Sequence, residues 1–300
     1  MRNLVLFGVM SFVWGLTWAA IKFGLMVLPP LFLAALRYLF AAAMLIAFVP
    51  GWRMAFAEGR LNRTVLSAVL VVAGTYGPIF WAMQSVPSGL SGLTNLALVP
   101  IFLFVLATLI GEERPTVRHA VALIVGCAGL VNLFWSRLEG ADNASALGLA
   151  AIVAGTASIC VGSVVARPLI DPVGPLALTL VHSAIGGAAL LAIALAIEPI
   201  SLSTLAAVAS PEAIGSLFFL SIFGTIIAYS LYLRLFREWG MARAGLYAFV
   251  SPIIALATGA WLFGERIGLP ETAGAVLLLV AAGLALFRGS RSVPSRSNQE

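Results

Sequence analysis

Ten runs of about 20 residues, each dominated by apolar side chains, follow one another along the chain and are broken by Pro, Gly or charged residues. A helix of about 20 residues spans the hydrocarbon core of a bilayer, so each run predicts one membrane-spanning helix. The composition agrees, because 61% of the 300 residues are hydrophobic and only 10% are charged. A soluble domain of this length has too small an interior to bury that surplus. The runs cover residues 4–26, 31–50, 64–84, 89–110, 117–135, 147–165, 175–197, 213–236, 241–263 and 270–288.

The positions of Lys and Arg predict how these spans are oriented, because cytoplasmic loops carry an excess of both residues. If the N-terminus is cytoplasmic, 13 of the 17 basic residues fall on the cytoplasmic side. Only Arg137 and Arg266 then fall outside, while Lys22 and Arg37 lie within runs. We therefore expect a multi-pass protein of the cell inner membrane with both termini in the cytoplasm. The first run leads into further apolar runs, which predicts a first span and not a removable signal.

Two segments of the chain resemble each other. Leu98-Val99-Pro100 precedes Gly111-Glu112-Glu113-Arg114, and Val250-Ser251-Pro252 precedes Gly264-Glu265-Arg266, with 13 residues from Pro to Glu in both. The alternative is chance similarity between two stretches rich in Leu, Ala and Gly. A true repeat predicts two halves of five spans, and because five is odd the second half is inverted, as in secondary transporters. We expect a first repeat at residues 1–140, a second at 141–288, and a disordered cytoplasmic tail at 289–300.

The segment Phe12-Val13-Trp14-Gly15-Leu16-Thr17-Trp18 resembles the aromatic-Trp-Gly start of helix 1 in the drug/metabolite transporter superfamily. Together with the Gly-Glu-Arg turn before the last span of each half, it makes the chain similar to EamA-type members. Within these, it most resembles the YddG-type exporters of aromatic and other neutral amino acids. The resemblance implies an all-α membrane protein in which ten transmembrane helices, as two inverted five-helix repeats, surround a central cavity.

All 12 carboxylates fall in loops or at the ends of runs. Intramembrane carboxylates are the usual proton relays and Na⁺ ligands, so this placement disfavours both kinds of coupling, and also a membrane aspartyl protease. The chain has no HExxH and no P-loop sequence, and Cys127 and Cys160 have no metal-ligand spacing around them. We expect no enzyme activity, no cofactor and no metal. The basic residues show no nucleic-acid-binding pattern.

Three ionisable residues lie inside runs, away from the run ends. Lys22 is seven residues before Pro29 and Arg37 is seven after Pro30, which places both about 10 Å below the outer end. At one depth, the two cations predict gating or attraction of a carboxylate substrate; in the alternative interpretation both side chains reach back to the interface. His182 is the intramembrane group that titrates near neutral pH. It either lines the cavity, carries a proton, or is a satisfied histidine of the bundle.

Polar and aromatic residues at helical spacing predict the walls of a binding site. An amide in the apolar part of a span is costly without a partner, and aromatic residues near mid-span lie away from the interfacial belts. Packing is the alternative for the aromatic residues. Pro100 and Pro252 interrupt two further spans, as Pro78 does, and each is either a hinge or a static kink. The expected substrate-binding residues are Trp14, Trp18, Tyr76, Phe80, Asn95, His182, Tyr229 and Tyr247.

These observations predict a secondary transporter that exports small metabolites, with neutral and aromatic amino acids as the expected substrates, by alternating access. The alternative keeps the fold and exports purines, nucleosides or drug-like metabolites. A membrane enzyme lacks a visible nucleophile–base or metal constellation, and a channel would call for rings of polar residues from symmetric subunits. The expected partners are a small-molecule substrate and the lipid bilayer, and we expect a monomer or weak homodimer.

Overall fold

The computed structural model describes residues 2–111, 117–139, 143–239, 247–265 and 268–286, and their regular structure is helical throughout. Each apolar run is helical in its described part. Eight runs form single helices: α1 (Arg2–Leu25), α2 (Pro30–Ile46), α5 (Ser88–Leu109), α6 (Val117–Glu139), α7 (Asn143–Ala166), α9 (Pro175–Ile197), α14 (Tyr247–Phe263) and α15 (Leu269–Leu286).

The two remaining runs are each divided by a π-helical segment. The first is made of α3 (Leu61–Ala68), η2 (Val69–Ala73) and α4 (Gly74–Ala82), and the second of α11 (Pro211–Phe218), η4 (Phe219–Ile227) and α12 (Ala228–Trp239). The connections hold the short helices η1 (Trp52–Phe56), η3 (Arg167–Leu169), α8 (Ile170–Val173) and α10 (Leu202–Ala207).

Six helical segments are long and apolar enough to cross a bilayer, and shorter apolar helices occupy the other four runs. This length and composition fit a membrane protein. The acidic-basic turn at Glu112-Glu113-Arg114, Arg266 and the tail at 289–300 lie outside the described residues.

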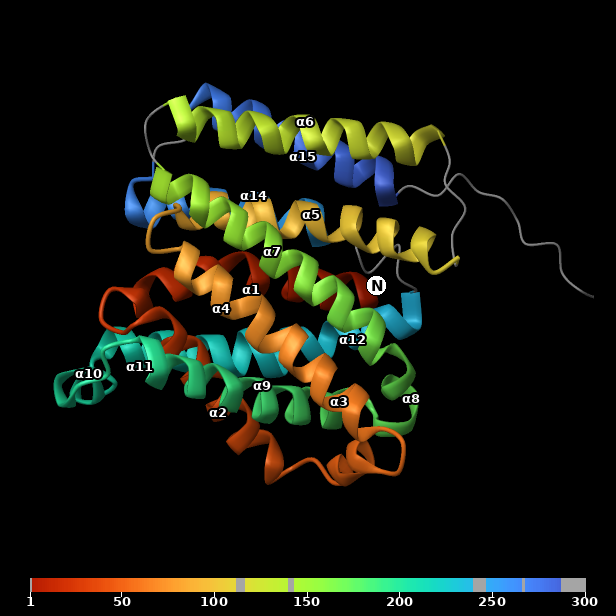
Figure 1. Cartoon of the computed structure of the whole chain (residues 1–300), viewed down its shortest axis with the longest axis vertical. Helices are drawn as coiled ribbons and strands as arrows, with labels where there is room; N and C mark the ends of the chain where they lie inside the picture. The colour runs from red at the N-terminus through yellow and green to blue at the C-terminus, as the bar shows by residue number, and fades with distance from the viewer. Residues whose placement is uncertain (1, 112–116, 140–142, 240–246, 266–267, 287–300) are drawn as a thin grey trace, which may run out of the picture.

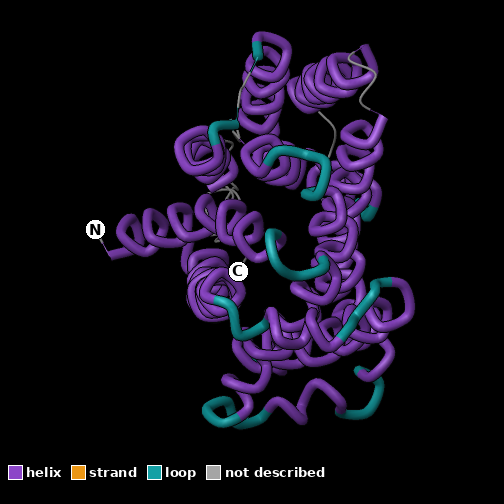
Figure 2. The backbone as a smooth tube through the Cα atoms, turned by 90° about the vertical axis from the view of Figure 1, so that its left-hand side faces the viewer, coloured by secondary structure: helices purple, strands orange, loops and turns teal. Residues whose placement is uncertain are grey.

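The long helices lie side by side with roughly parallel axes (Figure 1). α6 packs on α15 at one edge of the molecule and α2 packs on α9 at the opposite edge, with α5 on α14 between them. Figure 2, seen from the end that carries α10 and α11, shows many of the helices end-on with loops joining them. Each of these three pairs joins one helix from the first half of the chain to one from the second.

The two π-helical segments are the same local structure in two places. Each begins eight residues after the start of its helix, at Val69 after Leu61 and at Phe219 after Pro211. A π turn has backbone hydrogen bonds between residues five apart instead of four. In both places a threonine hydroxyl also bonds the carbonyl five residues earlier: Thr75 Oγ1 donates to Leu70 O at 2.8 Å and Thr225 Oγ1 donates to Leu220 O at 3.0 Å.

Two glutamates bind the first backbone N–H groups of helices in the other half of the chain. Glu198, just after α9, accepts hydrogen bonds from Leu31 N at 2.7 Å and Phe32 N at 2.8 Å at the start of α2. Glu265, just after α14, accepts from Ser88 N at 2.7 Å and Gly89 N at 2.9 Å at the start of α5. The first N–H groups of a helix have no partner within it, and the positive end of its dipole favours a carboxylate.

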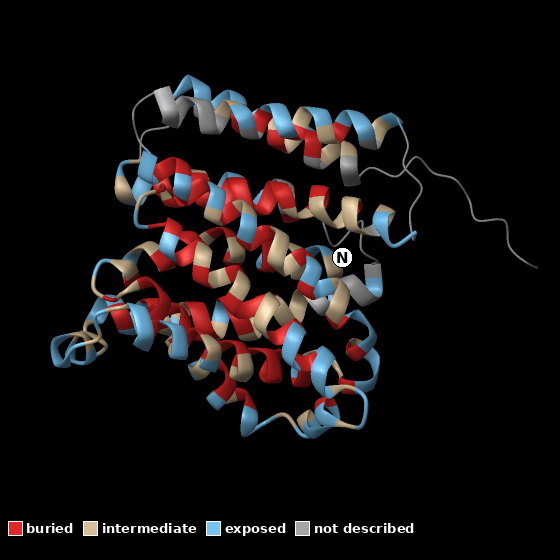
Figure 3. Cartoon of the chain, viewed as in Figure 1, coloured by how far each residue is buried: buried red, intermediate tan, exposed pale blue. Residues whose placement is uncertain are grey.

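Buried residues follow the inward faces of the central helices, whereas the outer faces of α6 and α15 carry many exposed ones (Figure 3). Exposed apolar side chains such as Ile124 and Val276 there suit a lipid environment. Small residues let the central helices approach closely. A Cβ built on Gly186 of α9 would lie 2.3 Å from Val72 Cβ and 2.7 Å from Ala68 O.

Candidate functional site

A cavity of about 120 Å³ lies between α1, α2, η2, α4, α5, α7, α9, η4, α12 and α14. A single water needs on the order of 10–15 Å³ on this scale, so the cavity holds a larger molecule or several waters. No Asp or Glu lines it within the described ranges. Of the eight residues predicted to bind substrate, seven line this cavity together with Arg37: Trp14, Trp18, Tyr76, Asn95, His182, Tyr229 and Tyr247.

Arg37 is the charged residue of the cavity wall. Its side chain is buried, and its guanidinium carbon lies 4.9 Å from the ring centre of Tyr38 and 5.0 Å from that of Tyr76. Its Nε donates a hydrogen bond to Thr225 Oγ1 at 3.2 Å. No carboxylate of the described residues forms an ion pair with it. Burying a charge is costly without a partner, and the two aromatic rings and the threonine hydroxyl are the described groups that stabilise this one.

Aromatic rings form a second part of the wall. The ring of Trp14 lies 4.7 Å from that of Tyr247 and 5.3 Å from that of Tyr232, and Tyr232 stacks on Tyr229 at 6.1 Å. The indole Nε1 of Trp14 donates to Gly224 O at 3.2 Å. This bond holds the indole against η4, so the cavity presents a positioned aromatic surface.

Asn95 and His182 bring two further polar groups. Asn95 Nδ2 donates to Thr156 Oγ1 at 2.9 Å, which joins α5 to α7. His182 Nε2 lies 2.9 Å from Ser67 Oγ, which joins α9 to α3. The second ring nitrogen of His182, Nδ1, is buried and has no hydrogen-bond partner in the part of the chain that the structure describes.

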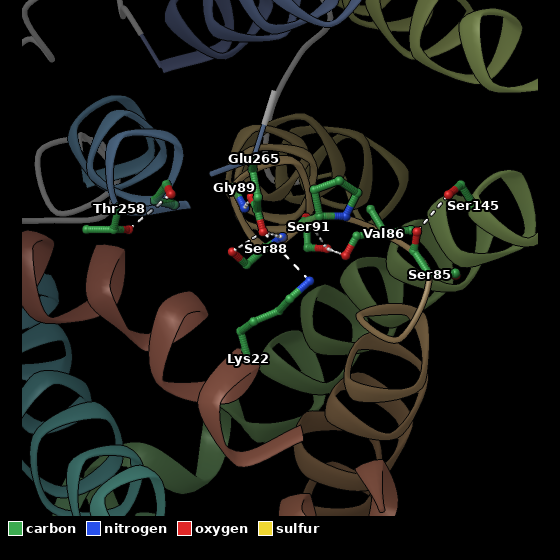
Figure 4. Close-up of polar contacts among 11 residues, drawn as sticks. Lys22, Ser85, Val86, Ser88, Gly89, Ser91, Ser145, Thr258 and Glu265 are labelled. Atoms are coloured by element: carbon green, nitrogen blue, oxygen red, sulfur yellow. Dashed lines mark hydrogen bonds and ion pairs between the residues drawn. The ribbon is translucent and has the colours of Figure 1, made fainter. Parts of the chain in front are cut away.

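Lys22 and Arg37, predicted to act together at one depth, are not brought together. Lys22 does not line the cavity. It points towards the turn after α14, where its Nζ lies 3.8 Å from Glu265 Oε1 (Figure 4). Glu265 Oε1 also accepts from Ser88 Oγ at 2.7 Å. The two cations lie on different faces because α1 turns Lys22 towards α5 and α14, whereas α2 turns Arg37 towards η4.

Four other predicted residues do not line the cavity. Phe80 is fully buried behind Tyr76, with ring centres 6.3 Å apart. Pro78, Pro100 and Pro252 lie inside α4, α5 and α14, which continue through them.

Sequence reasoning missed Tyr38 and Ser67, which carry no signal in an apolar run. Thr225 shares a helical face with Tyr229 by its spacing, and the dipeptide Gly224-Thr225 repeats Gly74-Thr75 150 residues further on.

The comparison with known proteins agrees with this architecture. The sequence profile of the EamA-like transporter family matches residues 2–135 and again residues 146–287. The chain belongs to the EamA-like transporter family. It is therefore a multi-pass transporter of the inner membrane, as its relatives and its apolar helices indicate.

Two relatives and one solved structure cover nearly the whole chain. The uncharacterized inner membrane transporter YedA of Escherichia coli K12 is 30% identical over 282 residues, 92% of this chain and 89% of its own. A probable amino-acid metabolite efflux pump of Salmonella typhimurium LT2 is 26% identical over 291 residues, 92% of this chain and 91% of its own. A crystal structure 18% identical in sequence covers 95% of this chain and 96% of its own with a TM-score of 0.63, which shows a shared fold.

Proposed function

We propose that the protein is a secondary transporter that exports neutral and aromatic amino acids across the inner membrane by alternating access. The observation that carries the proposal is the cavity, in which buried Arg37 has no acidic partner among the described residues and faces an aromatic wall. Guanidinium groups bind carboxylates strongly, and aromatic rings suit an apolar or aromatic side chain. The efflux pump named above, described as acting on amino-acid metabolites, supports the same substrate class.

The proposed architecture is ten spans in two inverted repeats, residues 1–140 and 141–288, with both termini in the cytoplasm. Three observations support it. The family profile matches once in each half. The π segments η2 and η4 begin 150 residues apart with the same Thr-to-carbonyl bond. The pairs α2–α9, α5–α14 and α6–α15 each join helices five spans apart, and the contact of α4 with α7 is matched by that of α12 with α1.

Alternating access requires that the two ends of the cavity open in turn. We assign the hinges to Pro78, Pro100 and Pro252, because a proline removes one backbone hydrogen bond from its helix. Lys22 belongs to the outer gate in this proposal, since its contact with Glu265 joins the ends of α1 and α14 to the start of α5. Opening the outer end breaks this contact.

The alternative cargo is a purine, a nucleoside or a drug-like metabolite. The stacked rings of Tyr229 and Tyr232 favour a flat ring of any kind. The unpaired charge of Arg37 disfavours a cationic drug, because two like charges in a cavity of low dielectric repel each other. The proposal needs no enzyme chemistry, cofactor or metal, and it is compatible with a monomer or weak homodimer.

The test is counterflow in liposomes that contain the purified protein. Vesicles are loaded with unlabelled L-phenylalanine, labelled L-phenylalanine is added outside, and uptake is measured with and without a pH gradient. We expect saturable uptake without a gradient, competition by other neutral amino acids and little by adenine or adenosine, and loss of uptake in Asn95→Ala and Tyr76→Ala. A folded, inserted protein that takes up no more amino acid than empty vesicles contradicts the proposal. If adenine or adenosine competes with the labelled substrate and other neutral amino acids do not, the result supports the alternative cargo.

A further inference from the structure

Arg37 and His182 occupy equivalent positions in the two halves of the chain. Each lies seven residues after the proline that begins its helix, Pro30 in α2 and Pro175 in α9. The two helices pack on each other in opposite directions, because Glu198 at the end of α9 binds the start of α2. Both side chains are buried, and both line the central cavity. The cavity therefore has one basic residue from each half.

The two residues lie at different depths. Tyr38 is level with Gly187 across the pair, since a Cβ built on Gly187 would lie 3.1 Å from Tyr38 Cβ. Arg37 is one residue from that level and His182 is five residues from it on the other side, because the helices are antiparallel. At 1.5 Å per residue, their Cα atoms are offset by about 9 Å along the bundle. The cavity therefore has one polar side chain, Arg37 or His182, at each of two depths along the bundle.

The hydrogen bonds around His182 determine what its free nitrogen offers. A serine hydroxyl has one hydrogen. Ser67 Oγ lies 3.1 Å from Thr64 O and 2.9 Å from His182 Nε2. We assign the tautomer in which Ser67 donates to Thr64 O and accepts from the imidazole, so that Nε2 carries the ring proton and Nδ1 has a lone pair. Nδ1 is buried and has no hydrogen-bond partner among the described residues, and in this tautomer it is able to accept from an N–H group.

We propose that the cavity binds the two charged groups of a zwitterion at separate residues: Arg37 holds the carboxylate and His182 Nδ1 accepts a hydrogen bond from the ammonium group. This inference rests on the proposed function and adds the atoms that recognise the substrate. A neutral imidazole explains how the site can bind an ammonium group without an acid. An Asp or Glu at this place would pair with Arg37 and cancel the charge that the substrate carboxylate needs.

The test uses three ligands of the same ring size: L-phenylalanine, 3-phenylpropionate, which lacks the ammonium group, and phenethylamine, which lacks the carboxylate. Their binding to the purified protein is measured by calorimetry. In the unmodified protein we expect L-phenylalanine to bind about 10- to 100-fold more tightly than either analogue, because each analogue leaves one hydrogen bond to a charged group unmade.

Removal of each residue then identifies its ligand group. In His182→Ala, the affinity for L-phenylalanine is expected to fall to that for 3-phenylpropionate, while 3-phenylpropionate binds as before. In Arg37→Met, both acids lose affinity and phenethylamine does not. His182→Gln keeps an acceptor oxygen and is expected to recover part of the preference for L-phenylalanine over 3-phenylpropionate. If His182→Ala does not fold, His182→Gln takes its place in the test.

Two results overturn the inference. One is an equal loss for L-phenylalanine and 3-phenylpropionate in the histidine variants, which would mean that His182 supports the cavity without touching the ammonium group. The other is a lower affinity of the histidine variants for both acids combined with a higher affinity for phenethylamine, which would mean that His182 acts as a second cation. In both, amino-acid binding persists and the proposed function stands. Failure of the unmodified protein to bind or take up L-phenylalanine overturns the proposed function instead.

Discussion

Thr75 and Thr225 make the same hydrogen bond 150 residues apart, each donating to the carbonyl five residues before it in a π-helical turn. Their surroundings differ. Leu70 O, the acceptor of Thr75, also accepts from Ser158 Oγ at 2.9 Å, whereas Thr225 Oγ1 also accepts from Arg37 Nε. One repeated local structure therefore serves packing in the first half and positions the cavity arginine in the second.

Thr225→Val and Thr75→Val form a matched pair that tests this difference. Thr225→Val leaves Leu220 O without its hydroxyl donor and removes the acceptor of Arg37, so we expect a loss of about 1–3 kcal/mol in stability and weaker substrate binding. In Thr75→Val, Ser158 still serves Leu70 O, so the loss is expected below about 1 kcal/mol. Unfolding in mixed micelles and calorimetric binding measure both. Equal effects of the two variants would contradict the assignment.

Arg37→Met is expected to abolish amino-acid counterflow while leaving the fold intact. The substitution replaces a buried cation, which has no acidic partner among the described residues, with an apolar chain of similar length. Such a charge is costly in an apolar interior, so we expect stability to be unchanged or higher.

Arg234→Met is the control for Arg37→Met. It removes an exposed arginine that pairs with Glu238 at 2.9 Å, and both transport and stability are expected to stay within error. Thermal unfolding and counterflow on the same preparations give the comparison. Retained transport in Arg37→Met would show that the cavity does not use this charge.

We expect Glu265 to contribute more to stability through its hydrogen bonds to the start of α5 than through its ion pair with Lys22. Glu265→Ala removes three hydrogen bonds, to Ser88 N, Ser88 Oγ and Gly89 N, so we expect a loss of about 2 kcal/mol or more. Lys22→Met breaks a long contact of 3.8 Å whose lysine side chain is 31% exposed, and it is expected to cost less than about 1 kcal/mol. A double-mutant cycle on unfolding free energies measures the interaction between Glu265 and Lys22 separately from the hydrogen bonds of Glu265. If that interaction is larger than the loss caused by Glu265→Ala in the Lys22→Met background, the ion pair contributes more than the hydrogen bonds and the expectation is wrong.

Gly186→Ala tests the close approach of α9 to the π segment η2. A Cβ there meets Val72 Cβ at 2.3 Å and Ala68 O at 2.7 Å, so the helices must separate, with an expected loss of about 1–3 kcal/mol. Gly215→Ala in α11 is the control, because nothing lies within 4 Å of its Cβ. Alanine is the better helix former, so Gly215→Ala is expected to be neutral or slightly stabilising. Comparable loss in both variants would contradict the packing argument.

Much of the cavity wall was predictable because helical spacing limits which residues share a face. The stripe through Trp14 and Trp18, and the mid-span positions of Tyr76 and Asn95, already predicted a polar and aromatic wall, and these residues line one cavity. Phe80 shares its stripe with Tyr76 and yet lies outside the cavity. One helix turn is enough to move a side chain from the cavity wall into the packing between helices.

The sequence by itself determined that this chain forms apolar helices and which family it joins, because runs of apolar residues, basic loops and short motifs are local properties. Tertiary structure decided which polar groups meet. Lys22 and Arg37 are similar by sequence position, but packing turns Lys22 to Glu265 and Arg37 to Tyr38, Tyr76 and Thr225. That choice depends on helix rotation and on contacts between residues far apart in the sequence, 188 positions for Arg37 and Thr225. Neither is encoded in the pattern of any single run.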